Sequence, residues 1–375
     1  MSAPPSFATV PGEGPLRVLV VGAGGMGRAW LRTVAADDRV ALAGVVDLDP
    51  ATARRAVTEE LGDVAVPVGA SLSEVAARGG AQAVIDVTVP EAHLPVTLEA
   101  FGLGLPVLGE KPLAADLAQA TALVKAAADS GLLFMVSQSR RYDRGLWALR
   151  DRAASLGDLG VLTQEFFRAP RFGGFREAMD HPLVLDMAVH NFDAARFVLG
   201  RDPVSVYCEE FNPSWSWYRG AAGATAVFEM SGGVRFVYTG SWCAPGLETS
   251  WNSRWRLSGA RGSATWDGED EPVTQLADDA PGAAVDHGPA PLPPGAGTAG
   301  ALAEFVTALR TGRVPMGECH DNLLSLAMVH AAIASSAAGA RVRVADVLAS
   351  ARAEAGIPAQ SPYPAPEKTG SGFPG

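Results

Sequence analysis

An aspartate and a histidine four positions apart form the most reactive pattern in this sequence. At this spacing Asp186 and His190 share one face of a predicted helix. A carboxylate one turn from an imidazole orients the ring and favours its protonated form, as in many general acids and bases that work near neutral pH. The pair could also serve only to stabilise its helix. A zinc site has less support, because no third ligand and no cysteine lie nearby in the sequence.

A lysine follows a short apolar run in the first third of the chain. Lys111 belongs to the string Gly109-Glu110-Lys111-Pro112, directly after the run at residues 106–108. This position predicts the carboxyl end of a strand, where open α/β sheets bind ligands. A lysine there can donate to a substrate oxygen and stabilise negative charge on it, while Glu110 could pair with the lysine or orient it. An exposed lysine in a surface turn explains the spacing equally well.

A glycine-rich turn near the N-terminus has the spacing of a dinucleotide-binding loop. An apolar strand leads into Gly22-Ala23-Gly24-Gly25-Met26-Gly27, a helix is predicted after it, and Asp47 follows 20 residues after Gly27. Gly22 permits the tight turn, Gly24 lets the backbone approach a pyrophosphate, and Gly27 lets helix and strand pack closely. The helix N-terminus offers free N–H groups to phosphates. The alternative is a glycine turn in a sheet that binds no nucleotide.

Asp47 bears on which dinucleotide the loop would hold. Its carboxylate could accept hydrogen bonds from both hydroxyls of an adenine ribose, and its charge would repel a 2′-phosphate. This favours NAD over NADP as the cofactor. Arg54 and Arg55 lie nearby in the sequence and weaken that preference.

Apolar runs alternate with helical stretches from Leu16 to about Ser137. The runs predict strands at residues 16–21, 40–46, 83–89, 106–108 and 132–136. The stretches between them predict helices at residues 26–36, 51–61, 91–101 and 113–130. Uninterrupted apolar strands separated by helices indicate a doubly wound parallel sheet that is covered on both faces.

The pattern changes after Gln138. Helices are predicted at about residues 142–155 and 182–199, with a loop rich in glycine and arginine at residues 169–179. Strands are predicted at residues 161–168, 204–211, 224–230, 234–241, 251–258 and 263–267. Serial strands joined by turns indicate an antiparallel sheet. A long loop at residues 278–298 precedes two more predicted helices, at residues 299–311 and 321–338.

Composition limits the class of protein. The chain has 375 residues, of which 48% are hydrophobic, so it can form two or three globular domains. Its net charge of −11 argues against broad nucleic-acid binding. No apolar stretch approaches the roughly 18 residues of a membrane span, and no signal peptide is visible. Three separated cysteines fit no disulfide framework, which agrees with a reducing cytoplasm.

Several further side chains could line a site or serve only the structure. Six of the eight tryptophans fall between Trp215 and Trp266, where they could stack on a sugar, although sheet core or a subunit interface is the commoner role. His93 is expected to be a hydrogen-bonded structural histidine. Four arginines could meet an anionic substrate group or form ion pairs at the surface, namely Arg140, Arg141, Arg168 and Arg171.

Three strings in the same order resemble a known family. Residues 22–27, 110–112 and 186–193 look like the motifs of the Gfo/Idh/MocA oxidoreductases, the relatives of glucose–fructose oxidoreductase and inositol dehydrogenase. The resemblance runs from about Leu16 to Val344. Residues 88–93 resemble the family's Thr-Pro-x-x-x-His string, with Val89 at the usual proline position. Residues 138–142 resemble its Asn-Arg-Arg-aromatic string, with Ser139 where asparagine is common.

The resemblance implies a two-domain α/β fold. An N-terminal Rossmann domain with a doubly wound parallel sheet would precede a C-terminal α/β domain, whose large, open, mostly antiparallel sheet often makes dimer or tetramer contacts. We accordingly expect an N-terminal extension at residues 1–15 and a dinucleotide-binding domain at 16–137. A substrate-binding and oligomerisation domain at 138–357 and a flexible tail at 358–375 would follow.

The resemblance also implies the chemistry. Lys111, Asp186 and His190 would be the catalytic set for oxidation of a secondary alcohol on a sugar or cyclitol, or for the reverse reduction. His190 would take the hydroxyl proton, Lys111 would stabilise the oxygen, and Asp186 would hold the imidazole or bind a neighbouring hydroxyl. No metal is expected. The residues expected to contact the cofactor are Gly22, Gly24, Gly25, Met26, Gly27, Asp47, Thr88, Glu110 and Lys111.

The leading interpretation is therefore a cytoplasmic, homodimeric or homotetrameric NAD-dependent dehydrogenase or reductase of sugars, inositols or related polyols, with no nucleic-acid or membrane partner. One alternative is an NAD-dependent glycosidase or eliminating enzyme with no net redox change. Another is a catalytically silent NAD-binding regulator. The joint presence of Lys111, Asp186 and His190 speaks against the regulator, because a sensor needs no acid/base pair.

Overall fold

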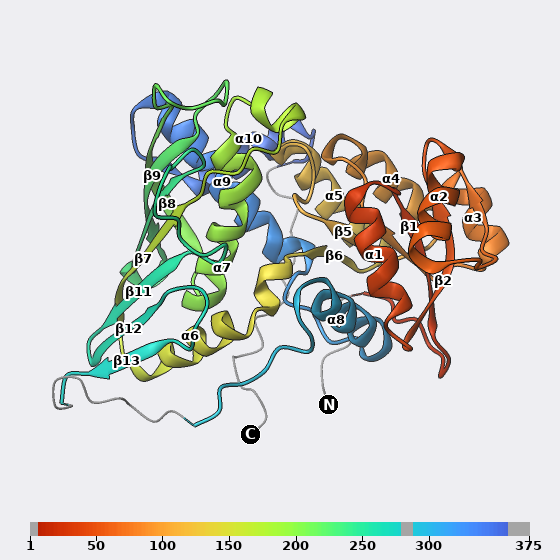
Figure 1. Ribbon diagram of the computed structural model, residues 1–375, viewed down its shortest axis with the longest axis horizontal. Coiled ribbons are helices and arrows are strands. Elements are labelled where there is room, and N and C mark those ends of the chain that lie inside the picture. Colours follow the sequence, from red (N-terminus) through yellow and green to blue (C-terminus); the bar gives the residue numbers. More distant parts are fainter. Residues whose placement is uncertain (1–6, 279–287, 359–375) are drawn as a thin grey trace. The chain divides into compact units, whose positions relative to one another are not determined.

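The chain forms two compact units, each built from more than one segment (Figure 1). The computed structural model describes residues 7–278 and 288–358. Of these, the first unit contains residues 7–138, 298–323 and 351–358, and the second contains the remainder. The expected tail lies almost entirely outside the described residues, as does the middle of the loop expected at 278–298.

The first unit contains a parallel sheet of six strands. In the sheet the strands follow the order β3-β2-β1-β4-β5-β6. Their bounds are β1 Leu16–Val21, β2 Val40–Val46, β3 Val68–Gly69, β4 Ala83–Asp86, β5 Val107–Glu110 and β6 Phe134–Ser137. The winding direction reverses between β1 and β4, and open α/β sheets bind ligands at such a switch point. The predicted doubly wound parallel sheet is thus confirmed.

Helices connect the strands of this sheet. They are α1 Gly25–Ala35, α2 Pro50–Leu61, α3 Leu72–Gly79, α4 Pro90–Gly102 and α5 Leu117–Ser130. Asp49, Ser71 and Asp116 precede α2, α3 and α5, and each accepts a backbone N–H of the first turn, which fixes where these helices begin. The sequence analysis did not predict β3 and α3, because two strand residues and two helical turns leave little periodicity to detect.

Segments from both ends of the chain complete the first unit. The N–H of Val10 donates to the carbonyl of Leu309 in α8 (Gly297–Thr311) at 2.8 Å, and Arg310 donates to the carbonyls of Val10 and Gly14. The side chain of Phe7 is buried. Residues 298–323 therefore belong to the first unit, whereas the sequence analysis assigned them to the second domain. Contacts between residues some 300 positions apart leave no trace in local periodicity.

The second unit contains a sheet of eight strands in the order β13-β12-β11-β7-β10-β9-β8-β14. All neighbouring strands are antiparallel except β7 and β10, so the predicted mostly antiparallel sheet is confirmed. Their bounds are β7 Leu159–Phe167, β8 Pro203–Phe211, β9 Gly223–Met230, β10 Arg235–Ser241, β11 Arg254–Gly259, β12 Gly262–Trp266, β13 Val273–Leu276 and β14 Val342–Arg343.

Helices cover one face of this sheet. Figure 1 shows α6 (Arg144–Ser155) and α7 (Val189–Leu199) on the same side of the strands. The ring of Phe192 on α7 packs edge-on against Phe228 of β9 and against Tyr238 of β10, with ring centroids 4.8 and 5.3 Å apart. All three rings are buried, and their packing anchors α7 on the sheet.

Two helices near the C-terminus belong to both units. Helix α9 (Cys319–Ala338) starts in the first unit and continues into the second, and α10 (Val344–Glu354) runs from the second back to the first. Within the described residues, no helix combines the length and the apolar character needed to cross a bilayer.

Candidate active site

The glycine loop follows β1 and has the geometry that the sequence predicted. Gly22 has φ +100°, and a Cβ on it would lie 2.7 Å from the carbonyl oxygen of Val87. A Cβ on Gly27 would lie 2.1 Å from the carbonyl oxygen of Gly22. Neither position can hold a larger residue without moving backbone, so Gly22 makes the turn and Gly27 lets α1 approach β1.

The start of α1 is open to a ligand. A Cβ added to Gly24 or Gly25 would meet no atom within 4 Å, and both residues are exposed. Gly24 precedes the helix, and no described side chain accepts a hydrogen bond from its first N–H groups. Met26 is 49% exposed beside them. The free N–H groups and the absence of side-chain bulk fit the phosphates of a dinucleotide, which bind at such helix N-termini.

Asp47 follows β2 and reaches the glycine loop. Its Oδ2 accepts the N–H of Ala23 at 2.8 Å, and its Oδ1 accepts the N–H of Asp49 at 3.0 Å. The carboxylate is half-buried, and each of its oxygens keeps a further lone pair. The guanidinium of the nearby Arg55 donates a hydrogen bond to the hydroxyl of Thr52, at 2.7 Å, and not to Asp47. The acceptor expected for an adenine ribose is thus in place, next to the loop expected for the phosphates.

Two buried polar residues, Asp86 and His93, hold the turn after β4 and the backbone next to Lys111. Asp86 Oδ1 accepts both the N–H and the hydroxyl of Thr88, and burial raises the pKa of this aspartate. The buried ring of His93 contacts the carbonyl of Thr88 through Nε2 at 3.2 Å and the carbonyl of Pro112 through Nδ1 at 2.9 Å. The imidazole of His93 therefore contacts the backbone at both Thr88 and Pro112. This arrangement is typical of a structural histidine.

Glu110 and Lys111 stand at the carboxyl end of β5, and the peptide bond between Lys111 and Pro112 is cis. The carboxylate of Glu110 accepts the indole N–H of Trp30 at 2.8 Å and the backbone N–H of Lys111 at 3.2 Å. Burial raises the pKa of Glu110. The glutamate thus fixes the backbone at Lys111, and its partner Trp30 on α1 was not foreseen from the sequence.

Asp186 and His190 lie on a helix with an irregular first half. Residues Pro182–Ala188 wind as a π-helix, and α7 continues from Val189 as an ordinary α-helix. Both side chains are half-buried. The predicted helix at 182–199 therefore exists, but its wider first turns replace regular α-helical spacing at Asp186. Such π-helical turns are frequent at functional sites.

Arg176 is a partner of Asp186 that the sequence analysis missed. Its Nε donates to Asp186 Oδ2 at 2.7 Å, and its guanidinium lies over the rings of Phe172 and Phe175. Arg176 belongs to the loop expected at 169–179, where Gly174–Ala178 form a short 3₁₀ turn. The loop is thereby tied to the candidate acid/base pair. Only its content of arginine and glycine signalled this in the sequence.

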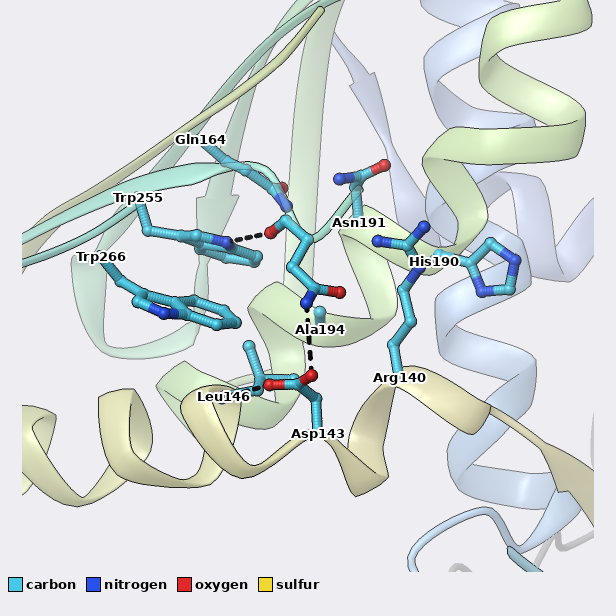
Figure 2. A pocket seen from close by; sticks show the side chains of 10 residues that line it. Arg140, Asp143, Leu146, Gln164, His190, Asn191, Ala194, Trp255 and Trp266 are labelled. Carbon is cyan, nitrogen blue, oxygen red and sulfur yellow. Dashed lines mark hydrogen bonds between the residues drawn. The ribbon is translucent and has the colours of Figure 1, made fainter. Parts of the chain in front are cut away.

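Arg140 and His190 line one pocket of the second unit, with Asp143, Asn191 and Asn252 around them (Figure 2). Figure 2 shows Arg140 rising from the 3₁₀ turn Ser139–Tyr142 toward the start of α7, where His190 and Asn191 lie. One nitrogen of Arg140 donates to the carbonyl of Trp251, and another contacts the sulfur of Met187 at 3.8 Å. Burial lowers the pKa of Arg140 to about 10.

The other three arginines expected near an anion have partners within the protein. Arg141 forms two hydrogen bonds of 2.7 Å with the buried carboxylate of Asp193. Arg168 pairs with Glu248 at 3.2 Å and lies over Trp251, and Arg171 lies over Trp217.

The tryptophans between Trp215 and Trp266 differ in exposure. Trp242, Trp255 and Trp266 are buried, while Trp215 is 63% exposed.

A group of potential ligand atoms occurs where α9 begins. Glu318, Cys319 and His320 bring three such atoms within 4.8 Å of one another. Glu318 accepts the thiol of Cys319 at 3.0 Å and contacts His320 Nδ1 at 2.7 Å. Burial raises the pKa of Cys319 well above its usual value, so the thiol stays protonated and serves as a donor. No pattern in the sequence pointed to these residues.

Known proteins resemble this chain in sequence and in structure. An uncharacterized protein, y4oX, of Sinorhizobium fredii is 29% identical over 91% of this chain and 99% of its own length. The inositol 2-dehydrogenase of Renibacterium salmoninarum is 34% identical over 51% of this chain, and the match spans 57% of that relative. An oxidoreductase from Agrobacterium radiobacter, solved with NAD+, L-tartaric acid and magnesium, has the same fold, with a TM-score of 0.78 at 18% identity over 88% of this chain and 99% of that one.

Matches to family descriptions cover both halves. Residues 16–138 match the oxidoreductase family with an NAD-binding Rossmann fold, and residues 155–265 match the GFO/IDH/MocA C-terminal domain. Together these ranges span more than half of the 375 residues and bear out the resemblance found in the motifs. The chain belongs to the Gfo/Idh/MocA family of NAD-binding oxidoreductases.

Proposed function

We propose that this protein is an NAD-dependent dehydrogenase or reductase that interconverts a secondary alcohol and a ketone on a sugar, inositol or related polyol. Relatives named inositol 2-dehydrogenase, about 34% identical over half of the chain, support this substrate class. The buried, free cysteines agree with a cytoplasmic location. A homodimer or homotetramer is the proposed assembly, to be measured by light scattering.

One observation carries the proposal. In the first unit the glycine loop, Asp47, Thr88 and Lys111 all follow parallel strands of one sheet, namely β1, β2, β4 and β5. The carboxyl ends of parallel strands meet at one edge, so the proposed nucleotide site and the ammonium group of Lys111 would share that edge. Asp47 would bind the adenine ribose and disfavour a 2′-phosphate, which supports NAD as the cofactor.

Three residues of the chain would take part in the reaction, each with its own role. Nicotinamide supplies the hydride acceptor or donor when bound. For oxidation, His190 would take the proton of the substrate hydroxyl, and Lys111 would donate a hydrogen bond to the same oxygen as negative charge develops on it. Asp186 would hold the imidazole or bind a neighbouring hydroxyl. Arg176, which is bonded to Asp186, would position that carboxylate.

Turnover tests the proposal directly. The protein is incubated with NAD and a panel of inositols, sugars and their acids, and the absorbance of reduced nicotinamide is followed. We expect turnover by the wild type and a loss of at least about a hundredfold in Lys111→Met and in His190→Ala, with unchanged NAD binding in His190→Ala. Lys125→Met is the matched control, since Lys125 pairs on the surface with Asp129.

Other results would reject the proposal. A wild type that binds NAD but oxidises and reduces nothing in the panel would favour a regulator. Product formation without any net change in reduced nicotinamide would favour a glycosidase or an eliminating enzyme. Higher turnover with NADP than with NAD would overturn the cofactor assignment, and Asp47→Ala is expected to narrow the preference for NAD.

A further inference from the structure

Three side chains of different ligand chemistry converge where α9 begins. A carboxylate oxygen of Glu318, the sulfur of Cys319 and a ring nitrogen of His320 all lie within 4.8 Å of one another. Within residues 7–278 and 288–358, no other three histidine, cysteine, aspartate or glutamate side chains come together in this way. The cluster belongs to the first unit and contains none of the residues proposed to act in catalysis.

The three atoms form a triangle of the size that a zinc ion requires. Glu318 Oε1 lies 3.0 Å from Cys319 Sγ and 2.7 Å from His320 Nδ1, and the sulfur lies 3.7 Å from the nitrogen. A point about 2 Å from all three atoms exists just outside their plane, and bonds from zinc to oxygen, nitrogen and sulfur are about 2.0–2.3 Å long. An ion at this point would reach all three ligands and keep a fourth coordination position.

The backbone of the cluster is fixed to the sheet of the first unit. The N–H of Val136 in β6 donates to the carbonyl of Gly317 at 2.8 Å, and Met135 and Glu318 form an antiparallel bridge. A Cβ on Gly317 would lie 2.4 Å from the carbonyl oxygen of Val136, so the two backbones approach closely. Because β6 is an edge strand, this segment extends the sheet by a short pairing. The ligand atoms are therefore held in place before any metal binds.

Hydrogen bonds connect the ligand atoms in the absence of a metal. Glu318 Oε1 accepts the thiol of Cys319 and the Nδ1 proton of His320, since a carboxylate only accepts, and Oε2 accepts the backbone N–H of His320 at 2.9 Å. Cys319 is fully buried, and its burial raises the pKa of the thiol well above its usual value. The side chain of His320 is 15% exposed, so the imidazole is the ligand nearest to solvent.

A divalent cation would replace the two protons that now lie between these atoms. On binding, the thiol proton leaves to solvent, and the ring proton of His320 moves from Nδ1 to Nε2. The sulfur and Nδ1 then each offer a lone pair to the ion. The thiolate and the carboxylate of Glu318 together balance its two positive charges, so no net charge remains buried.

The ligand types indicate which cation fits. Magnesium and calcium bind oxygen ligands almost exclusively, and a thiolate and an imidazole would be poor ligands for them. Zinc takes sulfur, nitrogen and oxygen ligands together, with tetrahedral geometry. One ligand of each kind therefore favours zinc.

We propose that Glu318, Cys319 and His320 bind one Zn²⁺ ion, which fastens the start of α9 to β6. This site differs from the expectation of no metal that followed from the family resemblance. It does not depend on the proposed function, because the ion would stabilise the first unit and would not act in hydride transfer.

Zinc binding tests the site without any substrate. Zn²⁺ is titrated calorimetrically into the full chain, freed of metal with a chelator, in the wild type, Cys319→Ser, His320→Gln and Cys208→Ser. Cys208 is the matched control because it is a second buried thiol, on β8, whose pKa burial raises to about 12. We expect the wild type and Cys208→Ser to bind one ion per chain with a Kd below about 10 μM. The affinity should fall by at least about a hundredfold in Cys319→Ser and about tenfold in His320→Gln.

Cobalt identifies the sulfur ligand. With Co²⁺ in place of zinc, a charge-transfer band from thiolate to metal should appear in the near ultraviolet for the wild type and Cys208→Ser, and not for Cys319→Ser. Zinc should also raise the melting temperature of the wild type by about 2 °C or more, and leave that of Cys319→Ser unchanged.

Two outcomes would overturn the inference. One is a wild-type Kd for zinc weaker than about 10 μM, and the other is equal zinc affinity in the wild type and Cys319→Ser. If Cys319→Ser does not fold, the half-buried His320 provides the decision, because equal affinity in His320→Gln and the wild type would overturn the site as well.

Discussion

The indole of Trp30 donates a 2.8 Å hydrogen bond to the carboxylate of Glu110, and this carboxylate also accepts the backbone N–H of Lys111. Trp30 lies on α1, the helix that begins at the glycine loop, while Glu110 ends β5. One half-buried carboxylate therefore connects the proposed nucleotide loop with the proposed catalytic lysine, so α1 and the backbone at Lys111 are coupled within the first unit.

Trp30→Phe should destabilise the protein in a pH-dependent way. Burial holds the pKa of Glu110 above its ordinary value of 4.5, so ionisation of Glu110 opposes folding as the pH rises above the pKa of the unfolded chain. The indole bond offsets that effect. Its removal should lower the free energy of unfolding by about 1–3 kcal/mol near pH 8 and by less near pH 4.5, as measured by urea unfolding.

The matched control is Trp215→Phe, which removes an indole bond of 3.0 Å to the carbonyl of Cys243. No ionisable group is involved, so its effect should be equal at the two pH values. A loss in Trp30→Phe that does not vary with pH would show that the bond does not stabilise the ionised form of Glu110.

Alanine substitutions of Gly24 and Gly27 at the start of α1 should affect different properties: Gly24→Ala the NAD affinity and Gly27→Ala the stability. In Gly24→Ala the new methyl group meets no atom within 4 Å, so the melting temperature should stay within about 2 °C of the wild type. NAD affinity, measured by calorimetric titration, should fall by about tenfold or more because the methyl group occupies the path of the pyrophosphate.

Gly27→Ala is the counterpart. Its methyl group would lie 2.1 Å from the carbonyl oxygen of Gly22, so α1 must move away from β1. We expect a loss of stability of about 1–3 kcal/mol even without NAD. Wild-type stability of Gly27→Ala, or unchanged NAD affinity of Gly24→Ala, would contradict these roles.

The pair of Arg141 and Asp193 should be more important for stability than for catalysis. Both side chains are buried, and Asp193 also accepts the hydroxyl of Ser325 at 2.6 Å. Arg141→Met leaves a buried carboxylate without its cation and should cost about 3–5 kcal/mol in urea unfolding. Arg141→Met combined with Asp193→Leu should recover part of this loss, because no unpaired charge remains. A double variant less stable than both single variants would refute the explanation.

Arg176→Met should weaken catalysis and leave cofactor binding unchanged. The variant loses the 2.7 Å bond to Asp186, so the carboxylate is no longer held toward the loop. We expect kcat/KM to fall by about tenfold and NAD affinity to stay the same. Arg219→Met is the control, because Arg219 forms an exposed ion pair with Asp180 in the same region. Equal activity in the two variants would remove Arg176 from the site.

Local pattern predicted the parts of the molecule that depend on neighbouring residues. The glycine spacing at residues 22–27, the acid after β2 and most strand runs of the two sheets are local signals, and the structure has them where the sequence indicated. The short strands β3, β13 and β14 were not predicted. Backbone sterics and burial on both faces of a sheet restrict which residues can occupy these positions, so they can be read without any knowledge of the fold.

Contacts between distant residues were the part that could not be predicted. Trp30 and Glu110 are separated by 80 positions, and Arg141 and Asp193 by 52. Such partners are chosen by the three-dimensional fold, and a lone tryptophan or arginine carries no sign of its partner. The π-helical winding of Pro182–Ala188 was likewise invisible, because the apolar pattern of a short helix is compatible with both windings.

Because Pro182–Ala188 wind as a π-helix, the number of residues in this segment affects where its side chains point. A π turn accommodates one more residue than an α turn. Deleting one residue from Pro182–Ala188 would allow ordinary winding. Because the π turn absorbs the extra residue, side chains before and after the segment would keep their directions, and only those within it, Asp186 among them, would turn to new ones. Changes in chain length here could therefore alter selectivity without replacing any side chain of the site.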